Sequence, residues 1–157
     1  MNSRSTENQT TDSTETVRTE PRILIVDDHE IVRDGIRNLL SRPRPKWVIC
    51  GTGSNGREAI KAVDELKPDI LILDITMPEM NGLEAASRIS KSGAKTRILI
   101  FTMHESVVLA DQIRKAGAQG FVLKSDAARN LILAIETIFA GGTFFNSTNK
   151  SAEQVPT

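Results

Sequence analysis

Four short, uninterrupted apolar runs limit what this chain can fold into more than any other feature of its sequence. They occupy residues 23–26, 70–73, 98–101 and 121–123 and consist entirely of isoleucine, leucine, valine and phenylalanine. Runs of this kind are typical of strands that are buried on both faces of a parallel sheet. Amphipathic segments of helical length separate the runs, so the sequence predicts an α/β fold with helical crossovers.

The expected elements alternate along the chain as five strands and five helices. We expect strands at about 22–27, 47–52, 69–74, 97–101 and 119–123. We expect helices at about 29–41, 55–66, 82–92, 105–116 and 126–140. This alternation predicts a doubly wound, five-stranded parallel sheet in the order 2-1-3-4-5, in which the first and third strands are neighbours.

Polar segments flank the part of the chain that carries these elements. Residues 1–20 are rich in Ser, Thr, Asn and Glu and hold almost no large apolar side chain, and residues 146–157 have a similar composition. Such segments cannot bury enough apolar surface to offset their ordering entropy. We therefore expect a disordered polar tail at 1–20, one domain at 21–145 and a polar C-terminal tail at 146–157.

Composition argues against several classes of function. Lys and Arg together number 20, as do Asp and Glu, so the zero net charge gives no electrostatic footprint for nucleic acid or an anionic membrane. No apolar stretch reaches the roughly 18 residues of a membrane span, and no signal peptide is recognisable. We therefore expect a cytoplasmic protein. Cys50, the only cysteine, is expected to be a small buried hydrophobe.

Polar side chains stand at the carboxyl ends of the four apolar runs. Asp27 and Asp28 follow the first run, Asp74 follows the second, Thr102 the third and Lys124 the fourth. Ligand sites in open α/β sheets lie beyond the carboxyl ends of the strands. The topology therefore predicts three carboxylates, a hydroxyl and an ammonium group at one edge of the sheet.

Each of these residues alone has a structural explanation. An Asp pair before a helix is a good N-cap, Thr102 suits an N-cap or a hydroxyl turn, and a lone Lys124 is most often solvated. Capping does not explain their joint placement. Three carboxylates held together repel one another unless a cation lies among them, and Mg²⁺ takes carboxylate and phosphate oxygens. The set therefore indicates a site for Mg²⁺ and a phosphoryl group, with Asp74 as the nucleophile that forms an aspartyl phosphate.

These residues resemble the receiver domain of two-component response regulators. The resemblance covers about residues 22–145 and rests on Asp27, Asp28, Asp74 followed by the segment MPEMNG, Thr102 and Lys124. It implies a flavodoxin-like receiver fold. It also implies a phosphoacceptor rather than an enzyme, one that takes a phosphoryl group on Asp74 from a sensor histidine kinase and supports its own phosphorylation and dephosphorylation.

The resemblance implies a metal site and a switch. Mg²⁺ would be held by Asp28, Asp74 and the backbone carbonyl of Thr76, with Asp27 reached through water. The switch residues would be Thr102, Phe121 and Lys124. Thr102 would move toward the phosphoryl group, the ring of Phe121 would pack into the space left behind, and Lys124 would contact the phosphate.

The segments 26–29 and 120–124 look most like receivers whose output is a LuxR-type helix-turn-helix. That class implies a phosphorylation-favoured homodimer, often through the first and fifth helices. Only a polar tail follows the fifth helix here, so we expect a downstream protein target and no direct DNA binding by this chain. The alternative is the receiver part of a truncated LuxR-type transcriptional regulator.

Three residues depart from the common receiver pattern. Ser125 stands where many receivers have a proline after a cis bond, and a cis bond before a non-proline residue costs roughly 3 kcal/mol. The loop geometry is therefore open, and Ser125 is a candidate cap for the fifth helix. Phe121 stands where tyrosine is common. His104 is either a loop residue before the fourth helix or an influence on phosphate lifetime.

Other functional classes fit the residues less well. Haloacid-dehalogenase phosphatases need a second Asp two residues after the nucleophile, where this chain has Thr76. A flavodoxin needs a hydroxyl- and glycine-rich phosphate loop after the first strand, where Asp27 and Asp28 would repel phosphate. A phosphorylation-independent interaction domain would not require the complete set of acids, hydroxyl and lysine.

Overall fold

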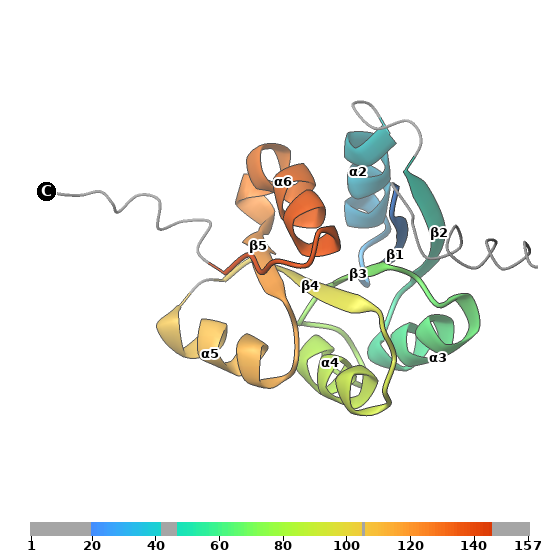
Figure 1. Ribbon diagram of the computed structural model, residues 1–157, viewed down its shortest axis with the longest axis vertical. Helices are drawn as coiled ribbons and strands as arrows, with labels where there is room; N and C mark the ends of the chain where they lie inside the picture. Colours follow the sequence, from blue (N-terminus) through green and yellow to red (C-terminus); the bar gives the residue numbers. More distant parts are fainter. Residues whose placement is uncertain (1–19, 42–46, 105, 146–157) are drawn as a thin grey trace, which may run out of the picture.

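The computed structural model describes residues 20–41, 47–104 and 106–145, which contain one five-stranded parallel sheet (Figure 1). The strands are β1 (Arg22–Val26), β2 (Val48–Gly53), β3 (Ile70–Leu73), β4 (Arg97–Thr102) and β5 (Gly120–Leu123). Their order, β2-β1-β3-β4-β5, confirms the predicted doubly wound topology. The expected tails at 1–20 and 146–157 lie outside the described residues, apart from residue 20.

Five helices connect and follow the strands in the described part of the chain. They are α2 (Glu30–Ser41), α3 (Gly56–Leu66), α4 (Gly82–Lys91), α5 (Val107–Lys115) and α6 (Ala127–Phe139). The side chains of Asn55, Asn81 and Ser106 each accept a hydrogen bond from the third amide of the helix that follows, α3, α4 and α5 respectively. These bonds satisfy amide donors that have no partner within the helix. These caps set the helix starts.

Two apolar layers sandwich the sheet. α2 and α6 cover one face, and α3, α4 and α5 cover the other (Figure 1). Successive strand residues point to opposite faces, so each apolar run supplies both layers. The α2–α6 layer receives Ile23, Ile25, Ile70, Ile72, Leu99, Phe101 and Val122. The other layer receives Leu24, Val26, Leu71, Leu73, Ile98, Ile100 and Phe121.

Several boundaries differ from the sequence-based expectation. β1 and β3 each end one residue early, so Asp27 and Asp74 lie just beyond their strands. The expectation that Ser125 caps the last helix is wrong, because Ser125 lies inside a 3-10 turn, η2 (Lys124–Asp126), and Asp126 occupies the N-cap position without a side-chain bond. Every peptide bond in the described residues is trans, including the one between Lys124 and Ser125.

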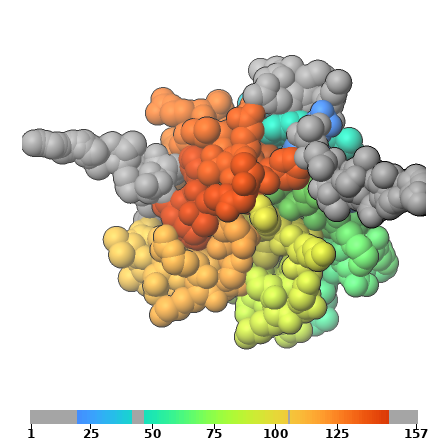
Figure 2. Space-filling view, in the orientation of Figure 1, coloured from blue at the N-terminus to red at the C-terminus, as the bar shows by residue number. Residues whose placement is uncertain are grey.

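The chain returns to the sheet after α6, which the sequence did not predict. Phe144 forms an isolated parallel bridge with Gly120 at the outer edge of β5. A side chain at Gly120 would overlap the carbonyl of Phe144, so the close approach requires glycine there. In the space-filling view, the last described residues lie between the surfaces of α6 and α5 (Figure 2).

Among the described residues, no helix combines the length and the apolar character that crossing a membrane requires.

Candidate functional site

β1 and β3 place the predicted acids side by side. The two strands pair in parallel with Val26 opposite Leu73, and the amide of Asp74 donates to the carbonyl of Val26 at 3.0 Å. Asp27 and Asp74 therefore start adjoining loops at the same level of the sheet. Both are buried, with 1% and 4% of their surface exposed, whereas the Asp28 side chain is 27% exposed.

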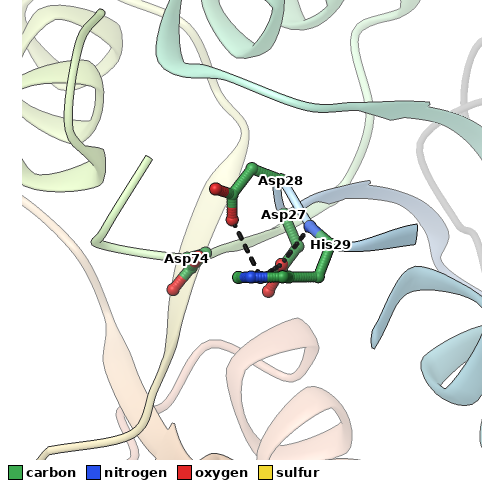
Figure 3. A group of neighbouring side chains, drawn as sticks. All are labelled: Asp27, Asp28, His29 and Asp74. Carbon is green, nitrogen blue, oxygen red and sulfur yellow. Dashed lines mark hydrogen bonds and ion pairs between the residues drawn. The ribbon is translucent and has the colours of Figure 1, made fainter. Parts of the chain in front are cut away.

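Asp27, Asp28, His29 and Asp74 converge from these two strand ends (Figure 3). Each offers one ligand atom, and the four atoms all lie within 4.8 Å of one another. His29 Nδ1 lies 3.0 Å from Oδ1 of Asp28 and 3.4 Å from Oδ1 of Asp27. The predicted carboxylate cluster is therefore present. His29 is a neighbour that the sequence reasoning missed, although its place directly after the acidic pair was a signal.

The backbone around Asp27 is held by α2. The amide of His29 donates to Oδ1 of Asp27 at 2.9 Å, so the carboxylate holds the loop that follows it. The Arg33 guanidinium donates to the main-chain carbonyl of Asp27 at 2.6 Å. Arg33 was also not predicted, and only its position one turn into the helix that follows the acidic pair pointed to it. These bonds fix Asp27 more tightly than Asp28.

Lys124 joins the cluster from the end of β5, as predicted. Its ammonium nitrogen lies 2.8 Å from Oδ2 of Asp27 and 3.3 Å from Oδ1 of Asp74. The side chain is only 16% exposed, so this cation is largely withdrawn from solvent. One ammonium group therefore bridges the two buried carboxylates, and the site as a whole keeps an excess of acidic groups.

The protonation equilibria reflect this crowding. Burial raises the pKa of the Asp74 carboxyl, and the neighbouring charge of Asp27 raises it further, against the opposing influence of Lys124. Burial alone lowers the pKa of Lys124, but its hydrogen bond to Asp27 and the charge of Asp74 outweigh that effect, so its pKa lies above the usual value. A cation among the carboxylates would favour ionised Asp74.

Thr102 and Phe121, two of the three predicted switch residues, occupy neighbouring strands. Thr102 ends β4 and is buried, and its hydroxyl accepts the amide of His104 at 3.2 Å, so it forms a hydroxyl turn rather than a helix cap. His104 itself is exposed. The ring of Phe121 on β5 is buried in the layer formed with α3, α4 and α5. β4 pairs with β5, whose end leads to Lys124 and through it to the acidic cluster.

The loop between β3 and α4 carries Thr76 and is tightly folded. The amide of Gly82 donates to the carbonyl of Ile75 at 2.7 Å. A side chain at Gly82 would overlap the carbonyl oxygen of Asp74, so α4 can start this close to the acid only with glycine. Thr76 is exposed, while Met77 on the same loop is buried in the core.

This arrangement matches a known protein family. The response regulator receiver domain matches residues 23–136. The matched residues include the three clustered acids, Thr102, Phe121 and Lys124. The chain is a response regulator receiver domain. The predicted fold class and the resemblance drawn from the site residues are therefore confirmed.

Curated relatives of this receiver are longer proteins. The oxygen regulatory protein NreC of Staphylococcus epidermidis is 40% identical over 124 residues, which cover 78% of this chain and 56% of that protein. The transcriptional regulatory protein YdfI of Bacillus subtilis is 36% identical over 120 residues, which cover 76% of this chain and 55% of that protein. The chain therefore spans little more than half the length of these relatives.

Solved structures place the receiver near the LuxR family. A LuxR-family two-component response regulator from Aurantimonas sp. is 40% identical, with a TM-score of 0.77 over 81% of this chain and 90% of that one. The isolated REC domain of RcsB from Salmonella enterica, solved with the phosphomimetic BeF3⁻, is 26% identical, with a TM-score of 0.73 over 81% of this chain and 94% of that one.

Receiver domains typically bind Mg²⁺ at an acidic pocket, and the donors of this receiver suit such an ion. Hard divalent cations prefer oxygen ligands, and Mg²⁺ keeps several waters when few carboxylates bind it. Asp27, Asp28 and Asp74 supply carboxylate oxygens from two adjoining loops. The partial exposure of Asp28 leaves a side of the cluster open to solvent. The donor set therefore fits the ion that the family implies.

Proposed function

We propose that this receiver accepts a phosphoryl group on Asp74 from a phosphohistidine of a sensor histidine kinase. The observation that carries the proposal is the Asp74 carboxylate at the end of β3, 3.3 Å from the Lys124 ammonium and beside two further acids. A carboxylate oxygen of Asp74 attacks phosphorus, the phosphorus–nitrogen bond of the donor breaks, and the histidine retains the electron pair. The product is an aspartyl phosphate on Asp74.

The chain's own residues prepare this transfer. Lys124 neutralises negative charge on the phosphoryl oxygens, and β5 holds it in reach of Asp74. Asp28, Asp74 and the carbonyl of Thr76 would hold Mg²⁺, with Asp27 reached through water. When bound, the ion offsets repulsion between the carboxylates and the incoming phosphoryl group. Burial of Asp74 limits access of water to the product.

Phosphorylation then changes a protein-interaction surface. The Thr102 hydroxyl, whose oxygen accepts from the His104 amide, donates its proton to a phosphoryl oxygen, and Phe121 repacks beside it. A bound group shifts a conformational equilibrium only through contacts that differ between the states. Thr102 and Lys124 supply those contacts, and the surface of α5, β5 and α6 displays the result to a downstream protein.

We assign the receiver to residues 21–145 and place it in the cytoplasm, where the catalytic part of a sensor kinase meets its substrate. The family match at 23–136 and the pairing of Phe144 with β5 support these bounds. The receiver also accepts phosphoryl groups from small donors and promotes their later hydrolysis, because the acids, hydroxyl and lysine needed for both directions belong to this chain.

A second candidate function is the receiver part of a LuxR-type transcriptional regulator. It is favoured by the relatives, one named a transcriptional regulatory protein, which extend well beyond the matched region. A mobility-shift experiment with genomic fragments tests whether the chain itself binds DNA. We expect no specific complex from the 157-residue chain, because its net charge is zero and counterion release contributes little. Specific binding would overturn the protein-target output.

Intact-protein mass spectrometry tests the phosphoacceptor assignment. Incubation with acetyl phosphate and Mg²⁺ should add one phosphoryl group, and Asp74→Asn should abolish the addition. Asp64→Asn is the matched control, because Asp64 is an exposed acid on α3 away from the cluster. Labelling of Asp74→Asn at the wild-type rate would refute the assignment.

A further inference from the structure

A short segment after α6 lies along the outer edge of β5. We call residues 143–145 the C-terminal strap. The amide of Phe144 donates to the carbonyl of Gln119 at 3.0 Å, and the amide of Phe121 donates to the carbonyl of Phe144 at 2.9 Å. The two bonds flank Gly120 and form a one-residue parallel bridge on the open edge of the sheet. The strap therefore occupies main-chain groups of Gln119 and Phe121, at the start of β5.

The last residue of the strap lies between an aromatic ring and a cation. The ring centroid of Phe145 lies 6.3 Å from that of Phe121, with the ring planes at 64°, an edge-to-face contact. The guanidinium carbon of Arg114 on α5 lies 4.0 Å from the centroid of the Phe145 ring. Phe145 thus links α5 to the buried ring of β5.

The strap and the acidic cluster share one strand. β5 is four residues long, and Lys124 follows it directly. Lys124 contacts Asp27 and Asp74, whereas Phe121, three residues earlier, contacts the strap through its ring and its amide. A shift of β5 that follows Lys124 toward a phosphoryl group must therefore change the contacts made by the strap.

We propose that Phe145 is a positioning residue for Phe121 and that the strap is coupled to the state of Asp74. This inference rests on the proposed phosphoacceptor function. The contacts of Phe145 hold Phe121 and β5 in the arrangement that Lys124 shares with Asp27 and Asp74. Phosphorylation loosens the strap and so carries the signal to the chain that follows residue 145. Coupling is reciprocal, so loss of the strap contacts strengthens binding at Asp74.

Amide hydrogen exchange of the wild-type chain tests the forward direction. Beryllofluoride with Mg²⁺ serves as the probe for phosphorylated Asp74. We expect exchange at the amides of Phe121 and Phe144 to rise at least about fivefold on beryllofluoride binding, the lower range of typical coupling. The amide of Ala59, which bonds within the first turn of α3, is the internal control and should not change.

Beryllofluoride titration of variants, followed by amide chemical shifts near Asp74, tests the reverse direction. Phe145→Ala should lower the half-saturating concentration about fivefold or more, and Phe145→Leu should restore part of the wild-type value. Arg114→Gln keeps the ring and removes only the cation, so it should shift binding in the same direction without endangering the fold. Lys115→Gln, at the next residue of α5, which is also exposed, should leave binding unchanged.

The outcomes separate this inference from the function on which it rests. Beryllofluoride could bind the wild type while the amide exchange at Phe121 and Phe144 and the half-saturating concentrations of the variants all stay unchanged. In that case the strap only stabilises the fold, and the inference is wrong. If beryllofluoride and acetyl phosphate both fail to modify Asp74, the proposed function and the inference fall together.

Discussion

Asp28 is the most exposed of the three clustered carboxylates, with 27% of its side chain accessible, and is therefore the most available to a cation. Asp27 is already committed, because its two carboxylate oxygens contact the His29 amide and the Lys124 ammonium. The difference follows from the backbone. Asp27 directly follows β1 and is buried, whereas Asp28 is the next residue of the loop toward α2.

We predict that Asp28→Ala abolishes Mg²⁺ binding and that Asp27→Ala weakens it less. A ligand at 100 times its Kd stabilises the folded state by about 2.7 kcal/mol. Thermal unfolding with increasing Mg²⁺ should therefore raise the Tm of the wild type and leave that of Asp28→Ala unchanged. A larger loss of binding in Asp27→Ala would reverse the roles assigned to the two acids.

The crowding of Asp74 also predicts a pH dependence of stability. The pKa of Asp74 is raised in the folded state, so folding favours its protonated form. The resulting contribution to folding stability is present below the pKa of the unfolded state and is lost as the pH rises through the pKa of the folded state. At neutral pH and without metal, Asp74→Asn should therefore be more stable than the wild type, by on the order of 1 kcal/mol or a few degrees in Tm.

Denaturant unfolding between pH 3.5 and 7.5, roughly the span from the usual Asp pKa to neutrality, measures that difference. The advantage of Asp74→Asn should shrink as the pH falls, while Asp64→Asn should show no comparable trend. A variant less stable than the wild type at pH 7 would show that the Lys124 contact outweighs burial and the repulsion from Asp27.

At the level of the elements, the proposed coupling between the site and the surface passes through the end of β4. Thr102 is buried and its hydroxyl oxygen accepts the amide of His104, so the hydroxyl proton can be donated to a phosphoryl oxygen. We predict that Thr102→Ala still accepts a phosphoryl group but shows smaller amide chemical-shift changes along α5 and β5. Thr52→Ala, at an exposed β2 position, is the control. A full-sized change in Thr102→Ala would exclude Thr102 as the transmitter.

The start of α4 is set by a close backbone approach. Gly82→Ala places a methyl group against the carbonyl of Asp74 and should cost about 1–3 kcal/mol, a typical penalty for overpacking. Gly35→Ala is the matched control, because open space surrounds that position on α2 and alanine favours helix by about 1 kcal/mol. Urea unfolding should move the two midpoints in opposite directions. A stabilised Gly82→Ala would contradict the tight fit at Asp74.

These elements show what could be predicted from the sequence. The sheet order and the meeting of Asp27, Asp74 and Lys124 were predictable because buried parallel strands are continuous apolar runs and their polar ends share one edge. The contacts of Arg33 and the bridge at Phe144 were not, because a single long side chain or a one-residue bridge leaves no periodic pattern. Packing against distant elements decides such contacts.

On the scale of the whole molecule, α2 and α6 lie on the same face of the sheet (Figure 1). The apolar series of α6 is mostly core, since Leu131, Ile135 and Ile138 are fully buried. Leu133 is the exception, with 51% of its surface exposed. An exposed leucine on this helix is a contact that a second copy of the receiver can cover.

We predict that beryllofluoride and Mg²⁺ shift the chain from monomer toward dimer and that Leu133→Gln opposes the shift. Burying a leucine contributes about 1.5–3 kcal/mol, so its loss should weaken dimerisation at least about tenfold. Light scattering over a range of protein concentrations measures this change. Val48→Thr is the control, because Val48 is equally exposed but lies on β2 at the far edge of the sheet. A monomer mass with beryllofluoride at high protein concentration would refute the dimer. An equal loss of dimerisation in Leu133→Gln and Val48→Thr would show that the dimer surface is not centred on Leu133.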